Sequence, residues 1–441
     1  MSASVAVFGT GYLGATHAAC MAELGHQVLG VDVDESKLAK LAAGEVPFYE
    51  PGLDEVLQRN IAAGRLRFTS SYEEAAEFAD IHFIGVGTPQ KKGEFAADLT
   101  YVDAVIDRLA PLLTRPAVIF GKSTVPVGTA ERLGARARAL APAGDDVEVA
   151  WNPEFLREGF AVQDTLHPDR LVLGVDRDRP GRTEEVAREV YARLLEEEIP
   201  FLVTDLATAE LVKTSANAFL ATKISFINAM AEVCEAAGAD VTTLADAIGH
   251  DARIGRRFLN AGVGFGGGCL PKDIRAFMAR AGELGADQAL TFLREVDAIN
   301  MRRRTRMVEM AREACGGTLL GTRVAVLGAA FKPESDDVRD SPALNVAGQI
   351  QLQGATVTVY DPKAMDNSRR LFPTLGYATS VAEAVEGADV VLVLTEWREF
   401  RDMRPARIND AVRQRKIIDG RNCLDPVAWR SAGWVYRGMG R

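Results

Sequence analysis

Residues 4–32 of the 441-residue chain have the sequence SVAVFGTGYLGATHAACMAELGHQVLGVD, and this stretch decides the fold. An apolar strand leads into Gly9, Gly11 and Gly14, a helical stretch follows, and a second strand ends at Asp32. In such a β-α-β unit the first glycine permits a tight turn, and the second lets the backbone approach a pyrophosphate. The third allows the helix to pack closely on the strand. The pattern predicts a doubly wound α/β domain that binds a dinucleotide.

Asp32 indicates which dinucleotide is bound. An acid at the end of the second strand accepts hydrogen bonds from the ribose 2′-hydroxyl and repels a 2′-phosphate, so NAD is predicted rather than NADP. Lys37 is the nearby residue that favours the phosphate. Two further strands, over 80–86 and 116–120, end close to Thr88 and to Ser123-Thr124. Ligands of doubly wound sheets bind beyond the carboxyl ends of the strands, so we expect these hydroxyl groups to be exposed there.

Composition and charge narrow the possible partners. With 47% hydrophobic and 25% charged residues, the chain is typical of a globular protein, and its length predicts roughly two to four domains. The net charge of −10 argues against binding nucleic acid or an anionic membrane surface. No apolar run reaches the roughly 18 residues of a membrane helix, and no signal peptide is visible, so we expect a cytoplasmic protein. The five cysteines and five histidines are scattered, which predicts neither a disulfide framework nor a metal site.

The stretch GVGFGGGCLPKD, residues 262–273, is the strongest candidate for chemistry outside the dinucleotide unit. Five glycines surround Cys269, and Pro271 suits the first turn of a following helix. Cys269 is therefore expected at a helix N-terminus, where the helix dipole favours the thiolate over the thiol. The alternative is a flexible glycine loop that holds a buried structural cysteine.

A long helix is predicted between Pro200 and Gly238, because that stretch contains no other Gly or Pro; Thr204 or Asp205 is the expected cap. Its apolar residues fall on several faces, which predicts burial between domains or subunits. Three polar residues share one stripe of it, namely Glu210, Lys213 and Asn217. A buried Lys needs an anionic partner, so the stripe favours function over a structural ion pair.

Two other charged segments allow alternatives. Glu154 and Glu158 share one face if their segment is helical, which suggests a functional or capping purpose; two solvated carboxylates are the alternative. Arg302–Arg304 is interpreted as a solvated basic turn.

A second α/β unit begins near Thr322, with strands over 322–328, 356–360, 390–394 and 416–419. It lacks the glycine fingerprint and therefore need not bind NAD.

Together these motifs resemble the UDP-glucose/GDP-mannose dehydrogenase family over essentially the whole chain. The segments that carry the resemblance are GTGYLG at 9–14, GVGTP at 85–89, KSTVPVG at 122–128, NPEFLREG at 152–159, KTSAN at 213–217, the cysteine loop, and FKP…DVRD within 331–340. LHPDR at 166–170, KISFIN at 223–228 and GVGFG at 262–266 favour the members that act on UDP-glucose. One departure is Gly268, where the family usually has Ser before the cysteine.

The resemblance implies a four-electron oxidation of a sugar-nucleotide alcohol to a carboxylate, UDP-glucose to UDP-glucuronate, with two NAD used in turn. Cys269 is the implied nucleophile, and Asp273 the base, acting through a water held by Thr124. Lys213 and Asn217 stabilise the oxyanion, and Glu154 helps water to hydrolyse the thioester. The implied cofactor-binding residues are Gly9, Gly11, Tyr12, Leu13, Gly14, Asp32, Lys37, Val86, Thr88, Ser123, Thr124, Glu158 and Arg339. The implied substrate-binding residues are Glu154, Phe155, Leu156, Lys213, Asn217, Arg253 (from a partner subunit), Phe265, Gly266, Lys332 and Arg421.

Several alternatives remain at this point. The same chemistry on GDP-mannose or a UDP-N-acetylhexosamine is the first. A two-electron hydroxyacid dehydrogenase is the second, although it would need no thiol, and a non-catalytic NAD-binding protein is the third.

The expected architecture is two Rossmann-like doubly wound domains joined by a long central helix in a helical domain. The expected boundaries are 1–200 for the NAD-binding domain, 201–318 for the helical middle and 319–441 for the sugar-nucleotide domain. The long apolar helix predicts a homodimer at least.

Overall fold

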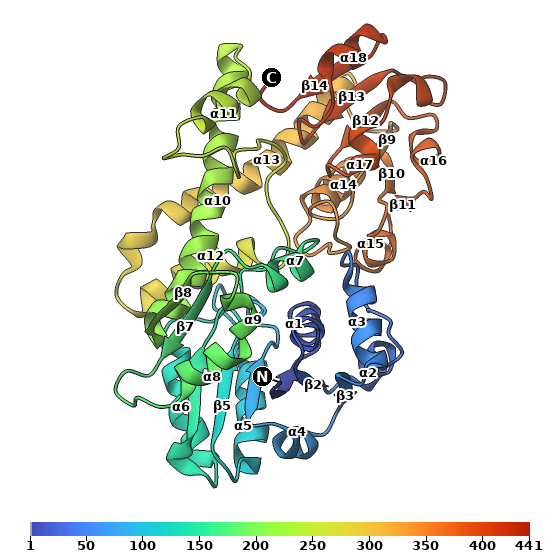
Figure 1. Ribbon diagram of the computed structural model, residues 1–441. Helices are drawn as coiled ribbons and strands as arrows, with labels where there is room; N and C mark the ends of the chain where they lie inside the picture. Colours follow the sequence, from blue (N-terminus) through green and yellow to red (C-terminus); the bar gives the residue numbers. More distant parts are fainter. Residues whose placement is uncertain (1) are drawn as a thin grey trace. The chain divides into compact units, whose positions relative to one another are not determined.

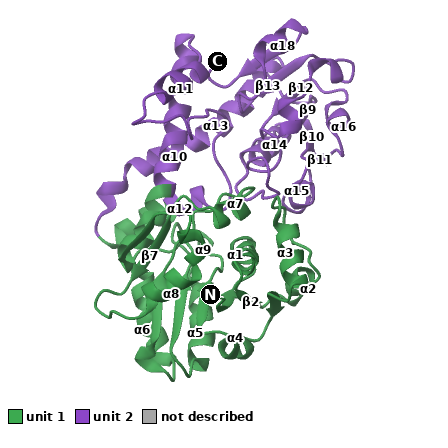
Figure 2. Cartoon of the chain, in the orientation of Figure 1, with its two compact units in different colours: residues 1–216, 275–284 green, residues 217–274, 285–441 purple. Residues whose placement is uncertain are grey.

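A computed structural model describes residues 2–441 (Figure 1). The chain forms two compact units (Figure 2): residues 1–216 with 275–284, and residues 217–274 with 285–441. Each unit is built on one predominantly parallel β-sheet, so the predicted α/β class with two doubly wound sheets is confirmed. The three-domain division, with boundaries after residues 200 and 318, stays a prediction.

The sheet of the first unit has the strand order β3-β2-β1-β4-β5-β6-β7-β8. Its chain order reverses between β1 and β4, which is the switch point where ligands of such sheets bind. All neighbouring strands are parallel except β6 and β7. The strands are β1 (Ser4–Phe8), β2 (Gln27–Val31), β3 (Leu66–Thr69), β4 (Ile81–Ile84), β5 (Ala117–Gly121), β6 (Val147–Trp151), β7 (Leu171–Val175) and β8 (Phe201–Asp205).

Helices cover both faces of this sheet, which is why its strands are apolar on successive residues rather than on alternate ones. On β1, Ala6 and Phe8 belong to one core cluster, and Val5 and Val7 belong to the other. The helices are α1 (Tyr12–Glu23), α2 (Glu35–Ala42), α3 (Leu53–Ala62), α4 (Tyr72–Phe78), α5 (Thr100–Leu109), α6 (Thr129–Leu140), α7 (Ala161–Leu166), α8 (Thr183–Val190) and α9 (Ala192–Leu195).

The sheet of the second unit repeats the same winding, in the order β11-β10-β9-β12-β13-β14, with all strands parallel. Its strands are β9 (Arg323–Leu327), β10 (Thr356–Tyr360), β11 (Gly376–Tyr377), β12 (Val390–Val393), β13 (Lys416–Asp419) and β14 (Val435–Gly438). The helices that lie wholly within the second unit are α11 (Val241–Gly249), α13 (Phe292–Ala314), α14 (Pro342–Leu352), α15 (Met365–Leu371), α16 (Val381–Val385), α17 (Arg398–Arg401) and α18 (Pro426–Ser431).

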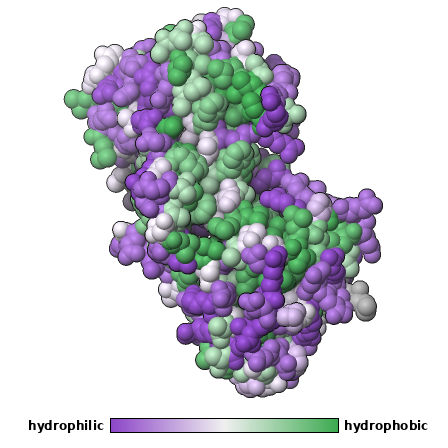
Figure 3. Space-filling view, turned by 90° about the vertical axis from the view of Figure 1, so that its left-hand side faces the viewer, coloured by the Kyte–Doolittle hydropathy of each residue, from purple (hydrophilic) through white to green (hydrophobic). Residues whose placement is uncertain are grey.

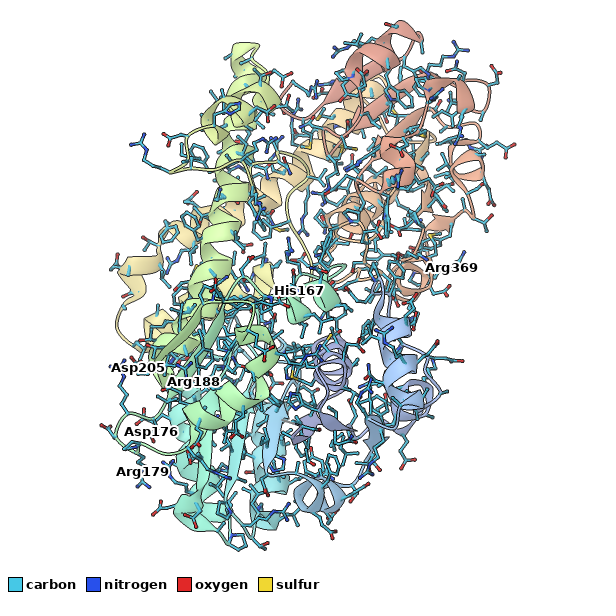
Figure 4. All side chains as sticks on the ribbon, viewed as in Figure 1. His167, Asp176, Arg179, Arg188, Asp205 and Arg369 are labelled. Carbon is cyan, nitrogen blue, oxygen red and sulfur yellow. The ribbon has the colours of Figure 1, made fainter. Side chains whose placement is uncertain are left out.

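Two helices contribute residues to both units: α10 (Leu206–Ala237) and α12 (Leu270–Glu283). The 32-residue α10 confirms the predicted long helix. Asp205, labelled in Figure 4, ends β8 and caps α10, because its carboxylate accepts a hydrogen bond from the Thr208 N–H at 2.7 Å. None of the helices within residues 2–441 combines the length and apolar character needed to cross a membrane.

Candidate active site

The glycine fingerprint has the geometry that a bound pyrophosphate requires. Gly9 has a φ of +88°, a left-handed conformation that favours glycine. A Cβ atom on Gly14 would lie 1.6 Å from the Gly9 carbonyl oxygen, so only glycine lets α1 begin this close to β1. A Cβ on Gly11 would meet nothing within 4 Å. The backbone of Gly11 thus borders open space at the start of α1, and this cradle fits a dinucleotide.

Asp32 follows β2 and faces this turn. Its Oδ2 atom accepts hydrogen bonds from the Thr10 N–H at 2.7 Å, the Thr10 hydroxyl at 2.9 Å and the Lys37 ammonium at 2.8 Å. Burial works against ionisation, but Lys37 and Thr10 outweigh it and hold the pKa of Asp32 below its usual value. The carboxylate is therefore charged and available to ribose hydroxyls, while Lys37 is paired with it in this structure.

The hydroxyl residues after β4 and β5 fasten two loops together. Ser123 donates to the Val86 carbonyl at 2.7 Å, and Thr88 donates to the Thr124 carbonyl at 2.8 Å. Thr88 and Ser123 are buried, and only Thr124 is half-buried. The prediction that these residues present exposed hydroxyls was wrong for Thr88 and Ser123, because their hydroxyls donate hydrogen bonds to backbone carbonyls of the facing loop.

Lys213 is buried in α10 and has the anionic partner that its burial demands. Its ammonium lies 3.2 Å from Glu154 Oε1, and the two side chains are 6% and 12% exposed. The Phe155 ring lies beside it, with its centroid 5.5 Å from Lys213 Nζ. On that ring the Arg170 guanidinium stacks at 3.9 Å. Lys213 and Glu154 thus form a desolvated acid–base pair within the first unit.

The segment that carries Glu154 is a loop between β6 and α7 and not a helix. The condition under which Glu154 and Glu158 would share a helical face is therefore not met. Asn152, next to the strand, anchors the loop by accepting from Lys122 at 3.0 Å and from Tyr191 at 2.7 Å. Burial lowers the pKa of Lys122 to about 8, although Glu154 opposes this effect.

Cys269 immediately precedes α12 and is exposed, so the predicted position at a helix start is confirmed. Its carbonyl accepts the Asp273 N–H at 2.9 Å, a hydrogen bond of the first helical turn. The Asp273 carboxylate, only 2% exposed, accepts from Asn217 Nδ2 at 2.6 Å and pairs with Lys272. A thiol at a helix N-terminus and a buried Asn–Asp pair on the same unit are the parts of a nucleophilic site.

The glycine loop before Cys269 rests on α13. Asn300 accepts from the Phe265 N–H at 2.7 Å and donates to the Phe265 carbonyl at 3.0 Å. A Cβ on Gly264 would lie 2.3 Å from Asn300 Oδ1, so the loop must be glycine there. Arg304, 2% exposed, also donates to the Phe265 carbonyl. The interpretation of Arg302–Arg304 as a solvated turn was wrong, since Arg303 and Arg304 are buried in α13.

Gly268 and Arg339 are packed together. A Cβ on Gly268 would lie 2.3 Å from Arg339 Cζ, because the guanidinium occupies that space. Asp337 holds Arg339 through both carboxylate oxygens, the closest contact being 2.6 Å. In this chain the arginine thus fills the position in which a serine side chain would stand.

The remaining predicted substrate residues of the second unit differ in their environments. Arg421 donates to the carbonyls of Leu394 at 2.8 Å, Gly264 at 2.9 Å and Phe331 at 3.3 Å, and so joins three loops. Arg253 is 88% exposed and pairs with Asp251. Lys332 lies in the loop after β9, with its ammonium 5.4 Å from the Phe331 ring centroid.

Asp361 stands after β10, where Asp32 stands after β2, but it serves the fold. It is 1% exposed. It accepts hydrogen bonds from four backbone N–H groups and the Trp397 indole. A carboxylate engaged in this way is not offered to a ribose, which separates the second unit from the first in function.

The first unit has a dinucleotide cradle with an ionised ribose acid, and the second has an exposed cysteine at a helix N-terminus. These are the parts expected of a nicotinamide-dependent dehydrogenase with a nucleophilic thiol. Comparison with known proteins gives the family. Residues 3–195, 207–302 and 325–426 match the NAD binding, central and UDP binding domains of the UDP-glucose/GDP-mannose dehydrogenase family, and the chain belongs to that family. The resemblance inferred from the motifs is thereby confirmed, and NAD is the cofactor.

Individual relatives cover the full chain. The UDP-glucose 6-dehydrogenase of Rhizobium meliloti (strain 1021) is 42% identical over 437 residues, which are 99% of each chain. A UDP-glucose dehydrogenase structure from the archaeon Pyrobaculum islandicum has a TM-score of 0.91 at 38% identity and covers 100% of this chain and 98% of its own. A UDP-D-ManNAc dehydrogenase structure from Pyrococcus horikoshii has a TM-score of 0.87 at 28% identity, with 99% of both chains covered.

The sequence analysis assigned no supporting role to three residues that hold this machinery together. Asn300, Arg304 and Lys122 form hydrogen bonds to the loops that carry the predicted site residues. Asn300 was not noticed at all, and Arg304 was interpreted as solvated, because both lie in α13 and reach the Gly262–Gly268 loop only through the fold. Lys122 stood in the quoted stretch at 122–128, but no role was assigned to it.

Proposed function

We propose that this protein oxidises UDP-glucose to UDP-glucuronate in two successive NAD-dependent steps at one site. The observation that carries the proposal is the exposed Cys269 at the start of α12, on the unit that holds the buried Asn217–Asp273 pair. A simple alcohol dehydrogenase needs no such thiol. The full-length similarity to enzymes named UDP-glucose 6-dehydrogenase supports the choice of substrate.

In the first step the sugar's primary alcohol becomes an aldehyde. Bound NAD would supply the acceptor for the hydride that leaves carbon 6 in this step and for the hydride that leaves it in the second oxidation. We assign the hydroxyl proton to Asp273, whose carboxylate is positioned by Asn217 Nδ2 at 2.6 Å and by Lys272. A carboxylate that already accepts two polar hydrogens has a fixed orientation, which favours transfer along one direction.

In the second oxidation Cys269 retains the intermediate. The thiolate sulfur bonds to the aldehyde carbon, and the carbonyl oxygen becomes an oxyanion, which we assign to Lys213 and Asn217. Directed donors of this kind contribute about 3–4 kcal/mol each to the transition state. Loss of the second hydride gives a thioester, and water then cleaves the carbon–sulfur bond with help from Glu154. The balance is one alcohol, one water and two NAD giving one carboxylate, two NADH and three protons.

We assign the binding of the two ligands to different parts of the chain, as the ranges of the three family domains support. Residues 1–200 take NAD, residues 201–318 supply the cysteine loop, and residues 319–441 take the nucleotide, through Lys332 and Arg421. Both NAD and sugar nucleotides are cytoplasmic metabolites, and we place the reaction in that compartment.

We also propose a homodimer. Phe219, Phe226 and Val233 are exposed by 66%, 49% and 57%, and their spacing of seven residues puts them on one face of α10. Figure 3 shows hydrophobic residues exposed among hydrophilic ones on the side of the molecule that it views. The test is the mass in solution by light scattering. Wild type at twice the chain mass and Phe226→Glu at the chain mass support a dimer, and a monomeric wild type contradicts it.

The substrate is tested by NADH formation with separate sugar nucleotides. We expect the highest kcat/KM with UDP-glucose, and much lower values with GDP-mannose and UDP-N-acetylmannosamine. The last is included because of the similarity to a UDP-D-ManNAc dehydrogenase. A preference for either alternative would keep the chemistry and reject the assigned substrate. Absence of NADH with all three would reject the proposed function.

A further inference from the structure

Glu50 is a buried carboxylate to which neither the motifs nor the mechanism above assigns a role. It lies between α2 and α3, in the stretch Tyr49–Gly52, and is 4% exposed. Its Oε2 atom accepts from the Gly159 N–H at 2.6 Å, and its Oε1 atom accepts from the Ala161 N–H at 2.7 Å. The Tyr12 hydroxyl donates to the same Oε2 atom. Both oxygens of this acid are therefore used.

The three donors belong to two segments that matter for function. Tyr12 is the first residue of α1 and stands inside the dinucleotide fingerprint. Gly159 and Ala161 lie at the start of α7, directly after the loop that carries Glu154 and Glu158. Helices α3 and α7 both pack against α1 (Figure 1). Glu50 thus connects the cofactor turn to the loop with two predicted site residues.

The hydrogen bonds around Glu50 form a rigid, buried network and are unlike a surface ion pair. The Tyr12 hydroxyl also accepts the Gly159 N–H at 3.1 Å, which closes a three-membered set of hydrogen bonds. The Tyr12 ring packs against Phe48, with their centroids 4.9 Å apart. Burial and the nearby Glu50 and Glu158 raise the pKa of Tyr12, so its hydroxyl keeps the proton that it donates.

We propose that Glu50 is a positioning residue that sets the Asn152–Gly159 loop against the NAD cradle before the cofactor binds. The proposal rests on the proposed function only in its effect on turnover, because the affinity for NAD alone already shows whether Glu50 positions the loop. A neutral amide at position 50 would turn an NH2 group toward an N–H donor and lose at least one of the three hydrogen bonds. The loop and Tyr12 would then have to be ordered by the cofactor itself, at the expense of its affinity.

The test compares Glu50→Gln with Glu148→Gln. Glu148 is a matched control, because its carboxylate caps α8 of the same unit in the same way, accepting from the Arg182 and Thr183 N–H groups at 3.0 Å each. The measurement is NAD affinity by titration calorimetry without any sugar nucleotide. We expect the Kd for NAD to rise about tenfold in Glu50→Gln, the scale of one lost charge-assisted hydrogen bond. We expect no change beyond twofold in Glu148→Gln, although both variants melt at lower temperature.

Tyr12→Phe keeps the acid and removes a single donor, so it remains informative if Glu50→Gln does not fold. It is expected to weaken NAD binding about threefold, and the double variant is expected to weaken it less than the product of the two single effects. Unchanged NAD affinity in Glu50→Gln, or an equal loss in Glu148→Gln, would overturn the positioning role. A failure of the proposed function would appear differently, as wild-type protein that binds NAD but makes no NADH from UDP-glucose.

Discussion

Replacing Glu210 with Gln is expected to change how the stability of the protein depends on pH. Glu210 lies in α10, one turn before Lys213, and is 2% exposed. Its two oxygens accept the Gly128 and Ala130 N–H groups, both at 2.7 Å, at the start of α6. Burial raises the pKa of Glu210 from 4.5 to about 7, although these N–H groups and Arg280 oppose the rise.

The sign of the effect follows from this raised pKa. Below pH 4.5 the acid is protonated in both the folded and the unfolded chain. Between pH 4.5 and about 7 the unfolded chain has released the proton that the folded chain still holds, so the free energy of unfolding falls as the pH rises. Above pH 7 the loss is complete. At about 1.36 kcal/mol for each pH unit, the difference amounts to about 3 kcal/mol.

The assay is urea unfolding of wild type and Glu210→Gln at pH 5 and pH 8. The glutamine does not titrate, so the free energy of unfolding of wild type relative to the variant should fall by about 2–3 kcal/mol between the two pH values, slightly less than the full difference because pH 5 already lies inside the window. A difference that stays constant, or one that grows in favour of wild type as the pH rises, would refute the raised pKa. It would mean that the two N–H groups stabilise the carboxylate more than burial penalises it.

Four further predictions concern single residues. Cys269→Ser should abolish uronate formation, measured by chromatography of the products, because a serine hydroxyl is scarcely ionised; steady uronate production would exclude the thioester route. Gly14→Ala should abolish NAD binding, since its Cβ would lie 1.6 Å from the Gly9 carbonyl. In α12 a Cβ added at Gly282 would meet nothing within 4 Å, so Gly282→Ala should stabilise the protein by about 0.5–1 kcal/mol, measured by thermal melting. A variant that melts at a lower temperature than wild type would contradict the open space at this position. Asp361→Ala leaves several buried N–H groups unpaired and should lower the free energy of unfolding in urea by about 3 kcal/mol, and a change below about 1 kcal/mol would contradict its role in the fold.

The sequence was sufficient to predict the doubly wound sheets and the long helix, because each has a local signal. The fingerprint has glycines at fixed spacing, and α10 has a long run without Gly or Pro. Strands β7 (Leu171–Val175) and β8 (Phe201–Asp205) were not predicted. A five-residue apolar run is too short for its periodicity to distinguish a strand from a helix, and their pairing with each other is a tertiary contact.

The candidate site could be predicted in its chemical groups but not in its supports. Cys269, Lys213 and Asp273 stand in distinctive motifs, and their roles stay predictions for mutagenesis to test. Glu50 and Asn300 hold the loops beside them from 109 and 35 residues away along the chain. Such pairs have no signature in a single sequence, since the residue type alone does not show whether an acidic side chain is buried or exposed.

The central claim is that one site performs both oxidations without releasing the aldehyde. The most direct measurement is the yield of NADH from a limiting, known amount of UDP-glucose in the presence of excess NAD, with the products identified by mass spectrometry. The account predicts two NADH for each UDP-glucose, with UDP-glucuronate as the product and no free aldehyde. One NADH for each UDP-glucose, with the aldehyde accumulating, would contradict it and remove Cys269 from its place as the nucleophile.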